Sequence, residues 1–339
     1  MPGLNDIGEF GFIHRIHRQC LVRPQGIFQA IGDDAAAFWT KSDTLTLVTT
    51  DLLVERVHFL RNQASAFSLG WKALAVNMSD IAAMGGTARE AFVSLAIPDD
   101  CSLNYLDDLY QGMHAMCCRF GVNILGGDTT GSKQDLIINV ALTGEVSPEE
   151  ILCRDGAKPG ELICSTGYLG DSRAGLHMIM NNIARSEPAL NTLYQAHISP
   201  HPCLREGRFL ASSRAVSSAM DVSDGLSSDL AHLCAASKTG ARIEAARIPI
   251  SDELTAFCTR FGYDPVQWAL AGGEDYTLLF TVRPEKLQDL MQIYEQEFST
   301  SFLVIGEMTD SQELHLVDSR GGVQPLESTG WNHFSKQNQ

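Results

Sequence analysis

Apolar stretches predict β-strands along most of the chain. The predicted strands of the first half are rich in β-branched and aliphatic residues and end in Gly, Pro or Asp. They are Thr44–Leu53, Ala91–Ile97, Leu136–Val146 and Glu161–Ser165. Later candidates are Ala241–Ile250, Tyr276–Val282, Ser301–Glu307 and Glu313–Val317. We expect these segments to form the sheets of the protein.

Apolar positions at helical spacing predict helices between the strands. Ser68–Met84 has this spacing and is followed by Gly85-Gly86, which is typical of a helix end. Tyr105–Phe120 also stops before a glycine, and Pro284–Phe298 begins with a proline suited to a first helical turn. Another helix is expected around Leu226–Ala236. The mixture of strands and helices indicates an α/β or α+β protein.

One segment, residues 147–160, interrupts this pattern after a predicted strand. It contains Pro148, Gly156, Pro159 and Gly160, which are typical of a connection rather than of a regular element. A chain of 339 residues is also too long for one ordinary hydrophobic core. We therefore expect two domains, residues 1–147 and residues 148–339.

Aspartates recur directly after apolar runs, within short segments of Gly, Ser and Thr. These segments are Gly32-Asp33-Asp34, Thr49-Thr50-Asp51, Asn77-Met78-Ser79-Asp80, Gly126-Gly127-Asp128-Thr129-Thr130 and Asp221-Val222-Ser223-Asp224-Gly225. Carboxylates that converge on one cleft repel each other unless cations neutralise them. Mg²⁺ is commonly held by a few carboxylates together with substrate phosphates. The pattern predicts a site with several metal ions that binds nucleotide phosphates.

Each acidic segment also has a structural interpretation. Asp51 taken alone is an Asx turn at a strand end, and Gly126-Gly127-Asp128 is equally well a capped turn. Asp80 lies among such apolar neighbours that a buried, liganded carboxylate is the better interpretation. The segment that begins at Asp221 could cap the next helix, which is compatible with anion binding there. It does not match a calcium loop, because the twelfth position is His232.

Composition indicates which binding partners, cysteine chemistry and location to expect for the protein. A formal net charge of −16 argues against nucleic acid, whose binding depends on clustered Lys and Arg. Nine scattered cysteines without a Cys-x-x-Cys pair favour reduced thiols over disulfides or a zinc site. No apolar stretch approaches the roughly 20 residues of a membrane helix, and no signal peptide is recognisable. We expect a cytoplasmic protein without a membrane partner.

Several common catalytic motifs are missing from the sequence. It has no Walker motif, no kinase Gly-rich loop with a His-Arg-Asp partner and no Gly-x-Ser-x-Gly elbow. The pairs His14/His17 and His197/His201 have the spacing of metal ligands but no third ligand nearby. Gly272-Gly273-Glu274-Asp275 is a second Gly-Gly-acid segment before a strand, where a hairpin or bulge is the plain interpretation.

Together, these segments resemble the thiamine-monophosphate kinases, in the superfamily of aminoimidazole ribonucleotide synthetase and selenophosphate synthetase. Each matching motif is weak alone, but they occur in the family's order from end to end. They are Gly8-Glu9-Phe10, residues 31–36, residues 49–55 with Val57-His58-Phe59, residues 70–77, residues 79–86, residues 126–129, residues 156–160, Asp221-x-Ser223-Asp224-Gly225-Leu226, residues 272–276 and Gly330-Trp331-x-His333-Phe334.

The resemblance implies a fold and a reaction. The fold is the two-domain aminoimidazole ribonucleotide synthetase-like fold: an N-terminal α/β domain whose sheet forms a barrel in a homodimer, and a C-terminal α+β domain that completes the substrate site. The reaction is the phosphorylation of thiamine monophosphate by ATP to thiamine diphosphate and ADP, assisted by several Mg²⁺ ions. The partners are then ATP and thiamine monophosphate, and no covalent nucleophile is expected.

Carried over residue by residue, the resemblance also implies three groups of site residues. The metal ligands are Asp33, Thr49, Thr50, Asp51, Asp80, Asp128, Asp221 and Asp224. The contacts to ATP are Tyr110, Gly127, Asp128, Arg154 and Ser223. The residues on the substrate side are His58, Glu274 and Trp331, with Trp331 placed to stack on an aromatic ring of thiamine.

Two positions depart from the family pattern. Ala30 stands where glycine is common, and Arg56 replaces the usual glycine two residues before His58. If that glycine requires a positive φ, an arginine there is unfavourable.

Three alternatives stay open: an aminoimidazole ribonucleotide synthetase-like enzyme, a Mg²⁺-dependent phosphohydrolase that uses water as nucleophile, and a nucleotide sensor without activity.

Overall fold

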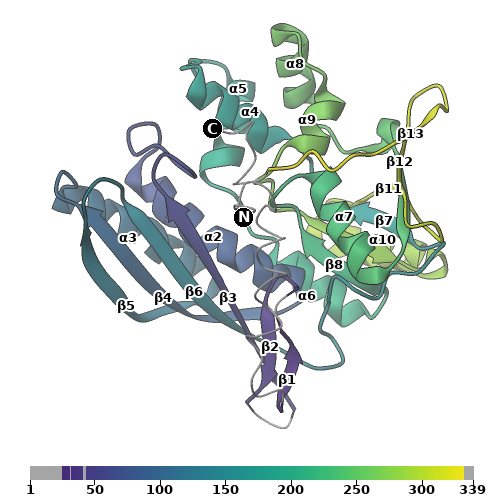
Figure 1. The fold of residues 1–339 in the computed structure, drawn as a ribbon, viewed down its shortest axis with the longest axis horizontal. Coiled ribbons are helices and arrows are strands. Elements are labelled where there is room, and N and C mark those ends of the chain that lie inside the picture. The colour runs from purple at the N-terminus through teal and green to yellow at the C-terminus, as the bar shows by residue number, and fades with distance from the viewer. Residues whose placement is uncertain (1–24, 31, 41–42, 332–339) are drawn as a thin grey trace, which may run out of the picture.

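The computed structural model describes residues 25–30, 32–40 and 43–331. The motif Gly8-Glu9-Phe10, the pair His14/His17, Ile31 and the pair His333-Phe334 lie outside these residues. The described chain contains two sheets with helices between and around them (Figure 1). None of the helices in this part of the chain has both the length and the apolar character that crossing a bilayer demands.

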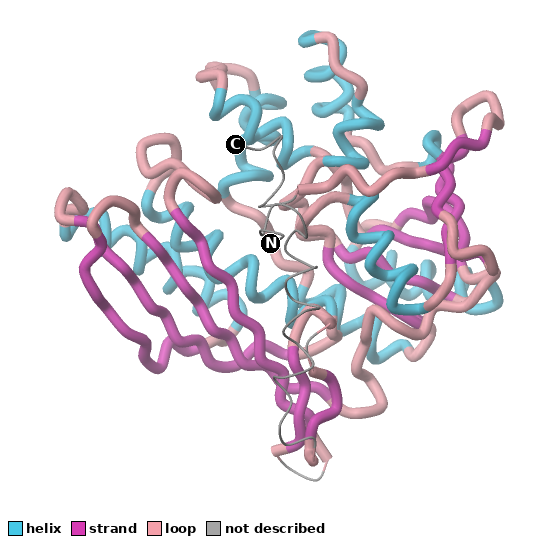
Figure 2. The backbone as a smooth tube through the Cα atoms, viewed as in Figure 1, coloured by secondary structure: helices cyan, strands magenta, loops and turns pink. Residues whose placement is uncertain are grey.

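The first sheet has six strands in the order β1-β2-β3-β6-β4-β5. They are β1 (Ile27–Gln29), β2 (Ala36–Trp39), β3 (Leu45–Val54), β4 (Thr87–Pro98), β5 (Asn123–Ser132) and β6 (Ile137–Val146). The β4–β5 pair is parallel, and the helix α3 (Leu103–Phe120) makes the crossover that such a pair needs. Together with α2 (Ala66–Ala83), this helix covers one face of the sheet, as Figure 2 shows.

The second sheet has seven strands in the order β13-β12-β9-β11-β7-β10-β8. They are β7 (Leu162–Ser165), β8 (Val216–Asp221), β9 (Gly240–Glu244), β10 (Leu278–Val282), β11 (Leu303–Thr309), β12 (Leu314–Val317) and β13 (Val323–Pro325). The helices of this half are α4 (Asp171–Met180), α5 (Pro188–Ile198), α6 (Leu204–Ser213), α7 (Leu226–Ser237), α8 (Asp252–Phe261), α9 (Pro265–Ala271) and α10 (Pro284–Phe298), with one 3₁₀ turn, η1 (Ala245–Arg247).

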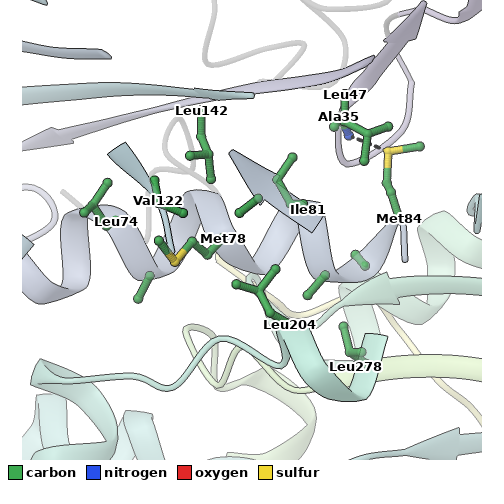
Figure 3. Packing of buried hydrophobic residues seen from close by; sticks show 14 of the residues in the cluster. Ala35, Leu47, Leu74, Met78, Ile81, Met84, Val122, Leu142, Leu204 and Leu278 are labelled. Atoms are coloured by element: carbon green, nitrogen blue, oxygen red, sulfur yellow. Dashed lines mark hydrogen bonds between the residues drawn. The ribbon is translucent and has the colours of Figure 1, made fainter. Parts of the chain in front are cut away.

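The helix α2 packs between the two sheets. Most of its residues are buried, which is typical of a helix that is apolar on all sides. Leu47 and Leu142 of the first sheet contact one side of this core, and Leu204 and Leu278 of the C-terminal half contact the other (Figure 3). Polar residues on α2 are therefore held at the junction of the two halves.

The structure confirms the predicted helices and nearly all of the predicted strands, with boundaries within a few residues. The strand predicted at Ala241–Ile250 is shorter, because a 3₁₀ turn begins at Ala245. The turn interpretation of Gly126-Gly127-Asp128 is wrong, because these residues lie inside the edge strand β5. A Cβ on Gly127 would lie 1.6 Å from the Val93 carbonyl oxygen, so glycine allows the close approach of the two strands.

Candidate active site

Three carboxylates from separate segments meet beside the C-terminal end of α2. Asp34 precedes β2, Asp80 lies in the last turn of α2, and Asp221 is the final residue of β8. One oxygen from each lies within 4.8 Å of the other two. We call this group the acidic triad. Asp80 is half-buried rather than buried as the sequence analysis expected, whereas Asp221 is only 2% exposed.

The electrostatics of the acidic triad favour the binding of a cation. Burial raises the pKa of Asp80 well above its ordinary value, and the charges of Asp51 and Asp221 raise it further. Burial likewise raises the pKa of Asp221, and the charge of Asp34 adds to the effect. Asp51, close to both, has a pKa raised to about 6 by burial. Oxygen donors in a crowded acidic group fit a hard divalent ion, which would relieve their repulsion.

Hydroxyl groups orient the members of the acidic triad. The Oγ of Ser79 donates a hydrogen bond of 2.6 Å to Asp221, and the Oγ1 of Thr49 donates to Asp80. Ser79 and Asp80 are neighbours on α2, so this helix holds both a triad member and a group that orients another. Thr49 is buried, as its position in the alternating pattern of β3 requires.

Amide side chains hold the neighbouring residues of β3. The Oδ1 of Asn77, on α2, accepts a hydrogen bond of 3.1 Å from the backbone N–H of Asp51. The Nδ2 of Asn139, on β6, lies 2.9 Å from the Thr50 Oγ1 and 3.1 Å from the Asp51 carbonyl oxygen. Thr50 is exposed and Asp51 is half-buried, and both lie inside β3 rather than at a strand end, so the turn interpretation of Asp51 is wrong.

Asp33, the expected ligand in the Gly32-Asp33-Asp34 motif, lies outside the acidic triad. Its Oδ2 accepts a hydrogen bond of 3.0 Å from the backbone N–H of Arg154, and burial together with the charge of Asp34 raises its pKa to about 7. The Arg154 guanidinium forms a bidentate ion pair with Asp34, at 2.7 and 3.1 Å. The structure therefore places Asp34, which the sequence analysis did not select, where a metal ligand was expected.

The residues expected to contact ATP come from several elements. Gly127 and Asp128 are exposed on β5, and Asp128 accepts a hydrogen bond from the Thr129 backbone N–H rather than joining the triad. Tyr110 is 39% exposed on α3. Ser223 lies in the loop after β8, where its carbonyl oxygen accepts a hydrogen bond of 2.7 Å from the Glu274 N–H.

The loop between β8 and α7 is held by a buried carboxylate that the sequence analysis missed. One oxygen of Asp229, which is 1% exposed, accepts hydrogen bonds from the backbone N–H groups of Asp224 and Gly225, at 3.1 and 3.0 Å. The Asp224 carbonyl oxygen in turn accepts a hydrogen bond of 3.0 Å from the Trp331 N–H. Asp224 and Trp331, assigned to different groups by the resemblance, are thus neighbours.

A second charged cluster lies further back along α2. The Nζ of Lys72 is 2.8 Å from the Oε1 of Glu274, and the Nδ1 of His197 is 3.3 Å from the Oε2 of the same carboxylate. Burial by itself would raise the pKa of Glu274, but Lys72 and His197 outweigh it and hold that pKa below its ordinary value. The charge of His58 also acts on Glu274, so two of the expected substrate-side residues are brought together.

Arg56 adopts the positive φ that the sequence analysis considered unfavourable for this residue. Its φ is 67°, in the left-handed region. The guanidinium forms a bidentate ion pair with Asp135, with both distances 2.8 Å. The loop before His58 is therefore built without the usual glycine.

Known proteins of one family match this chain over nearly its whole length. Residues 32–146 match the model of the AIR synthase related protein N-terminal domain, and residues 158–319 match that of the C-terminal domain. The thiamine-monophosphate kinase of Aquifex aeolicus is 35% identical, with 98% of this chain and 99% of the relative covered. That of Bacillus subtilis is 33% identical, with 96% and 99% covered.

A solved structure of AaThiL complexed with AMPPCP and TMP superimposes on this fold with a TM-score of 0.87. It is 32% identical in sequence, and the match covers 98% of this chain and 99% of that chain. The likeness thus extends over both sheets and the helix between them. The chain belongs to the thiamine-monophosphate kinase family, within the AIR synthase related proteins.

Proposed function

We propose that this protein transfers the γ-phosphoryl group of ATP to the phosphate of thiamine monophosphate, which gives thiamine diphosphate and ADP. The observation that carries the proposal is the acidic triad at the junction of the two halves. Relatives named thiamine-monophosphate kinase align with the chain over almost its full length. The related AaThiL structure holds AMPPCP and TMP together.

The acidic side chains would hold several Mg²⁺ ions. Asp34, Asp80 and Asp221 are the described carboxylates whose oxygens converge. The remaining ligands of the proposal are Asp33, Thr49, Thr50, Asp51, Asp128 and Asp224. When bound there, Mg²⁺ would neutralise charge on the phosphates of the nucleotide. The chain's own contribution is to keep these oxygens close together through Ser79, Thr49 and Asn77, despite their repulsion.

The reaction itself requires little covalent chemistry from the protein. An anionic phosphate oxygen of thiamine monophosphate attacks the γ-phosphorus in line, and the bond from that phosphorus to the β–γ bridging oxygen breaks, so ADP leaves with the electron pair. The attacking oxygen is already ionised near neutral pH, so no strong general base is required. Trapping a kinetically competent phosphorylated enzyme would contradict this direct transfer.

The remaining site residues divide between the two substrates. We assign Tyr110, Gly127, Asp128, Arg154 and Ser223 to ATP, and His58, Glu274 and Trp331 to thiamine monophosphate. The Glu274 N–H donates a hydrogen bond to the Ser223 carbonyl oxygen and the Trp331 N–H donates one to that of Asp224, so these residues are neighbours, as two substrates that react directly require. Two reacting groups held in fixed positions gain most of the rate that positioning can supply.

We also propose a homodimer that forms through the first sheet. The helices α2 and α3 cover only one face of this sheet (Figure 2). On the strands of the uncovered face, Leu52, Phe92 and Leu125 are 52%, 41% and 61% exposed. Large apolar side chains that gather on one face are typical of an interface. A sedimentation measurement that found monomers at micromolar concentration would contradict the dimer.

One assay tests the proposed reaction against its alternatives. The protein is incubated with ATP, Mg²⁺ and thiamine monophosphate, and both products are quantified. We expect thiamine diphosphate and ADP in equal amounts, and none with EDTA in place of Mg²⁺. Inorganic phosphate without thiamine diphosphate would instead indicate a phosphohydrolase, and no turnover a nucleotide sensor. Asp310→Asn, which alters an exposed carboxylate, is the control for a simple change of surface charge.

A further inference from the structure

Lys72 is a buried cation in the apolar helix α2. Only 4% of the residue is exposed, and its neighbours on both sides along the helix are apolar. Lysine is rarely buried without a partner, because removing its charge from water is strongly unfavourable. The 2.8 Å contact to Glu274 supplies that partner across the junction of the two halves. An apolar residue at this position would fit the helix, so its charge requires an explanation.

The segment that carries Glu274 is held in an unusual backbone conformation. Glu274 and Tyr276 have φ values of 64° and 53°, although neither is a glycine. Such conformations persist only where surrounding contacts enforce them, and they gather at functional sites. Here the N–H groups of both residues donate to the loop after β8, and the Asp275 carboxylate accepts a hydrogen bond of 2.7 Å from the Gly170 N–H at the start of α4.

Both oxygens of the Glu274 carboxylate have a partner. Lys72 contacts Oε1 and His197 lies near Oε2, while the Oγ of Ser172 is 3.0 Å from the same ring nitrogen of His197. Burial and the charge of Lys72 lower the pKa of His197 to about 3, so the imidazole is neutral and Lys72 is the cation of this cluster. Glu274 nevertheless keeps 25% of its side chain exposed.

We propose that Lys72 is a positioning residue for thiamine monophosphate: it holds Glu274 ionised and in one orientation at the substrate side of the site. The assignment rests on the proposed function. Glu274 is then ready to receive the thiamine moiety without being ordered first, which strengthens binding of that substrate and leaves ATP binding unaffected.

The position of Lys72 on α2 explains why this residue can perform the task. Asp80 follows it by eight residues on the same helix, a separation of about 12 Å along the helix axis at 1.5 Å per residue. A rigid helix therefore fixes the distance between the group that orients Glu274 and a member of the acidic triad. Thiamine monophosphate has to bridge these two places, because its ring system and its phosphate lie at opposite ends.

Steady-state kinetics of four variants test the proposal: Lys72→Met, Lys72→Arg, Glu274→Gln and the double variant Lys72→Met/Glu274→Gln. We expect Lys72→Met to raise KM for thiamine monophosphate by about 10- to 100-fold while KM for ATP changes less than about twofold. Lys72→Arg retains the charge and should recover part of the loss. The KM of the double variant for thiamine monophosphate should not exceed that of the more impaired single variant, because Lys72 acts through Glu274.

Controls separate this role from simple destabilisation and from failure of the proposed function. Arg205→Met removes an exposed ion pair with Glu297 and should leave both KM values unchanged. If Lys72→Met does not fold, Glu274→Gln carries the test, and a KM for thiamine monophosphate equal to that of the wild type overturns the proposal. Equal changes in both KM values also overturn it. A wild-type protein without thiamine-monophosphate kinase activity contradicts the proposed function instead.

Discussion

Two charged groups lie beside the helix α2, the acidic triad and the cluster of Lys72, Glu274 and His197, and they differ in how their negative charge is balanced. The acidic triad near the C-terminal end of α2 has raised pKa values at Asp80 and Asp221, because burial and like charges oppose ionisation. At the other group, Lys72 keeps the pKa of Glu274 below its ordinary value. Glu274 is thus paired with a cation of the protein itself, whereas the acidic triad is suited to bind cations that arrive with the nucleotide.

Arg154 does not remove this difference. Its guanidinium pairs with Asp34 at one side of the triad, and its charge lowers the pKa of Asp221 somewhat. The pKa values of Asp80 and Asp221 nevertheless stay raised, because one cation faces several carboxylates. If the acidic triad served stability alone, we would expect basic side chains of the protein to neutralise all of its carboxylates. The negative charge that Arg154 leaves unbalanced therefore indicates a functional site.

The largest effect should come from Asp80→Asn, which removes a charge from the acidic triad. We expect turnover of thiamine monophosphate to fall by about 1,000-fold, since the amide is a poorer ligand for Mg²⁺ and less charge on the phosphates is neutralised. In EDTA the same variant should be more stable than the wild type, because like-charge repulsion is reduced. Thermal melting and steady-state kinetics measure the two effects. Unchanged turnover would exclude Asp80 as a metal ligand.

Lys72→Met should have the opposite effect on stability. Removing the partner of a buried carboxylate leaves an uncompensated charge, so we expect the free energy of unfolding to fall by about 3 kcal/mol. Denaturant titration gives this value, and Lys72→Arg should lose less. If Lys72→Met were as stable as the wild type, the two groups of carboxylates would not differ in their balance of charge.

A smaller effect than those of the two substitutions is expected from pH. The stabilisation of the protein by Mg²⁺ should depend on pH because the carboxylates of the acidic triad and its neighbours titrate. The pKa values of Asp33 and Asp51 are raised from 3.8 to about 7 and about 6. Folding favours their protonated forms, so this contribution to stability is complete below pH 3.8 and is lost as the pH rises through 6 and 7. Mg²⁺ replaces the protons, so the increase in melting temperature that it causes should grow from pH 5 to pH 8.

His197 acts in the opposite direction, because its pKa is lowered from 6.5 to about 3. Its contribution is present above pH 6.5 and is lost as the pH falls through 3. That loss is the same with and without Mg²⁺, so the difference between the two melting temperatures isolates the carboxylates. A difference that stayed constant with pH would contradict the raised pKa values.

Arg56→Gly should have the smallest effect. Glycine relieves the positive φ of 67°, but the variant loses the ion pair with Asp135, which is 58% exposed on the arginine side and therefore weak. We expect the two changes nearly to cancel, so that the melting temperature moves less than with Lys72→Met. A large loss of stability would show that an exposed pair can matter as much as a buried one.

Much of the local structure follows from the sequence alone. The apolar spacing of Ser68–Met84 predicted α2, and the β-branched and aliphatic residues of Thr44–Leu53 predicted β3. The recurrence of Asp after apolar runs predicted an acidic site, and Asp80 and Asp221 do meet there, although Asp51 and Asp128 lie inside β3 and β5 rather than at strand ends. Local patterns are sufficient here because helix and strand periodicity depend on neighbouring residues.

The tertiary structure decided which of these residues meet. The sequence analysis selected Asp33, but it is the neighbouring Asp34 that meets Asp80 of α2 and Asp221 of β8 in the triad. The sequence around Gly127 predicted a turn, whereas in the structure this glycine lies in a strand against the Val93 backbone. Lys72 and Glu274 are distant in the chain, and their contact forms because the C-terminal half packs on α2. Long-range electrostatics depend on distances in space, which one-dimensional patterns do not contain.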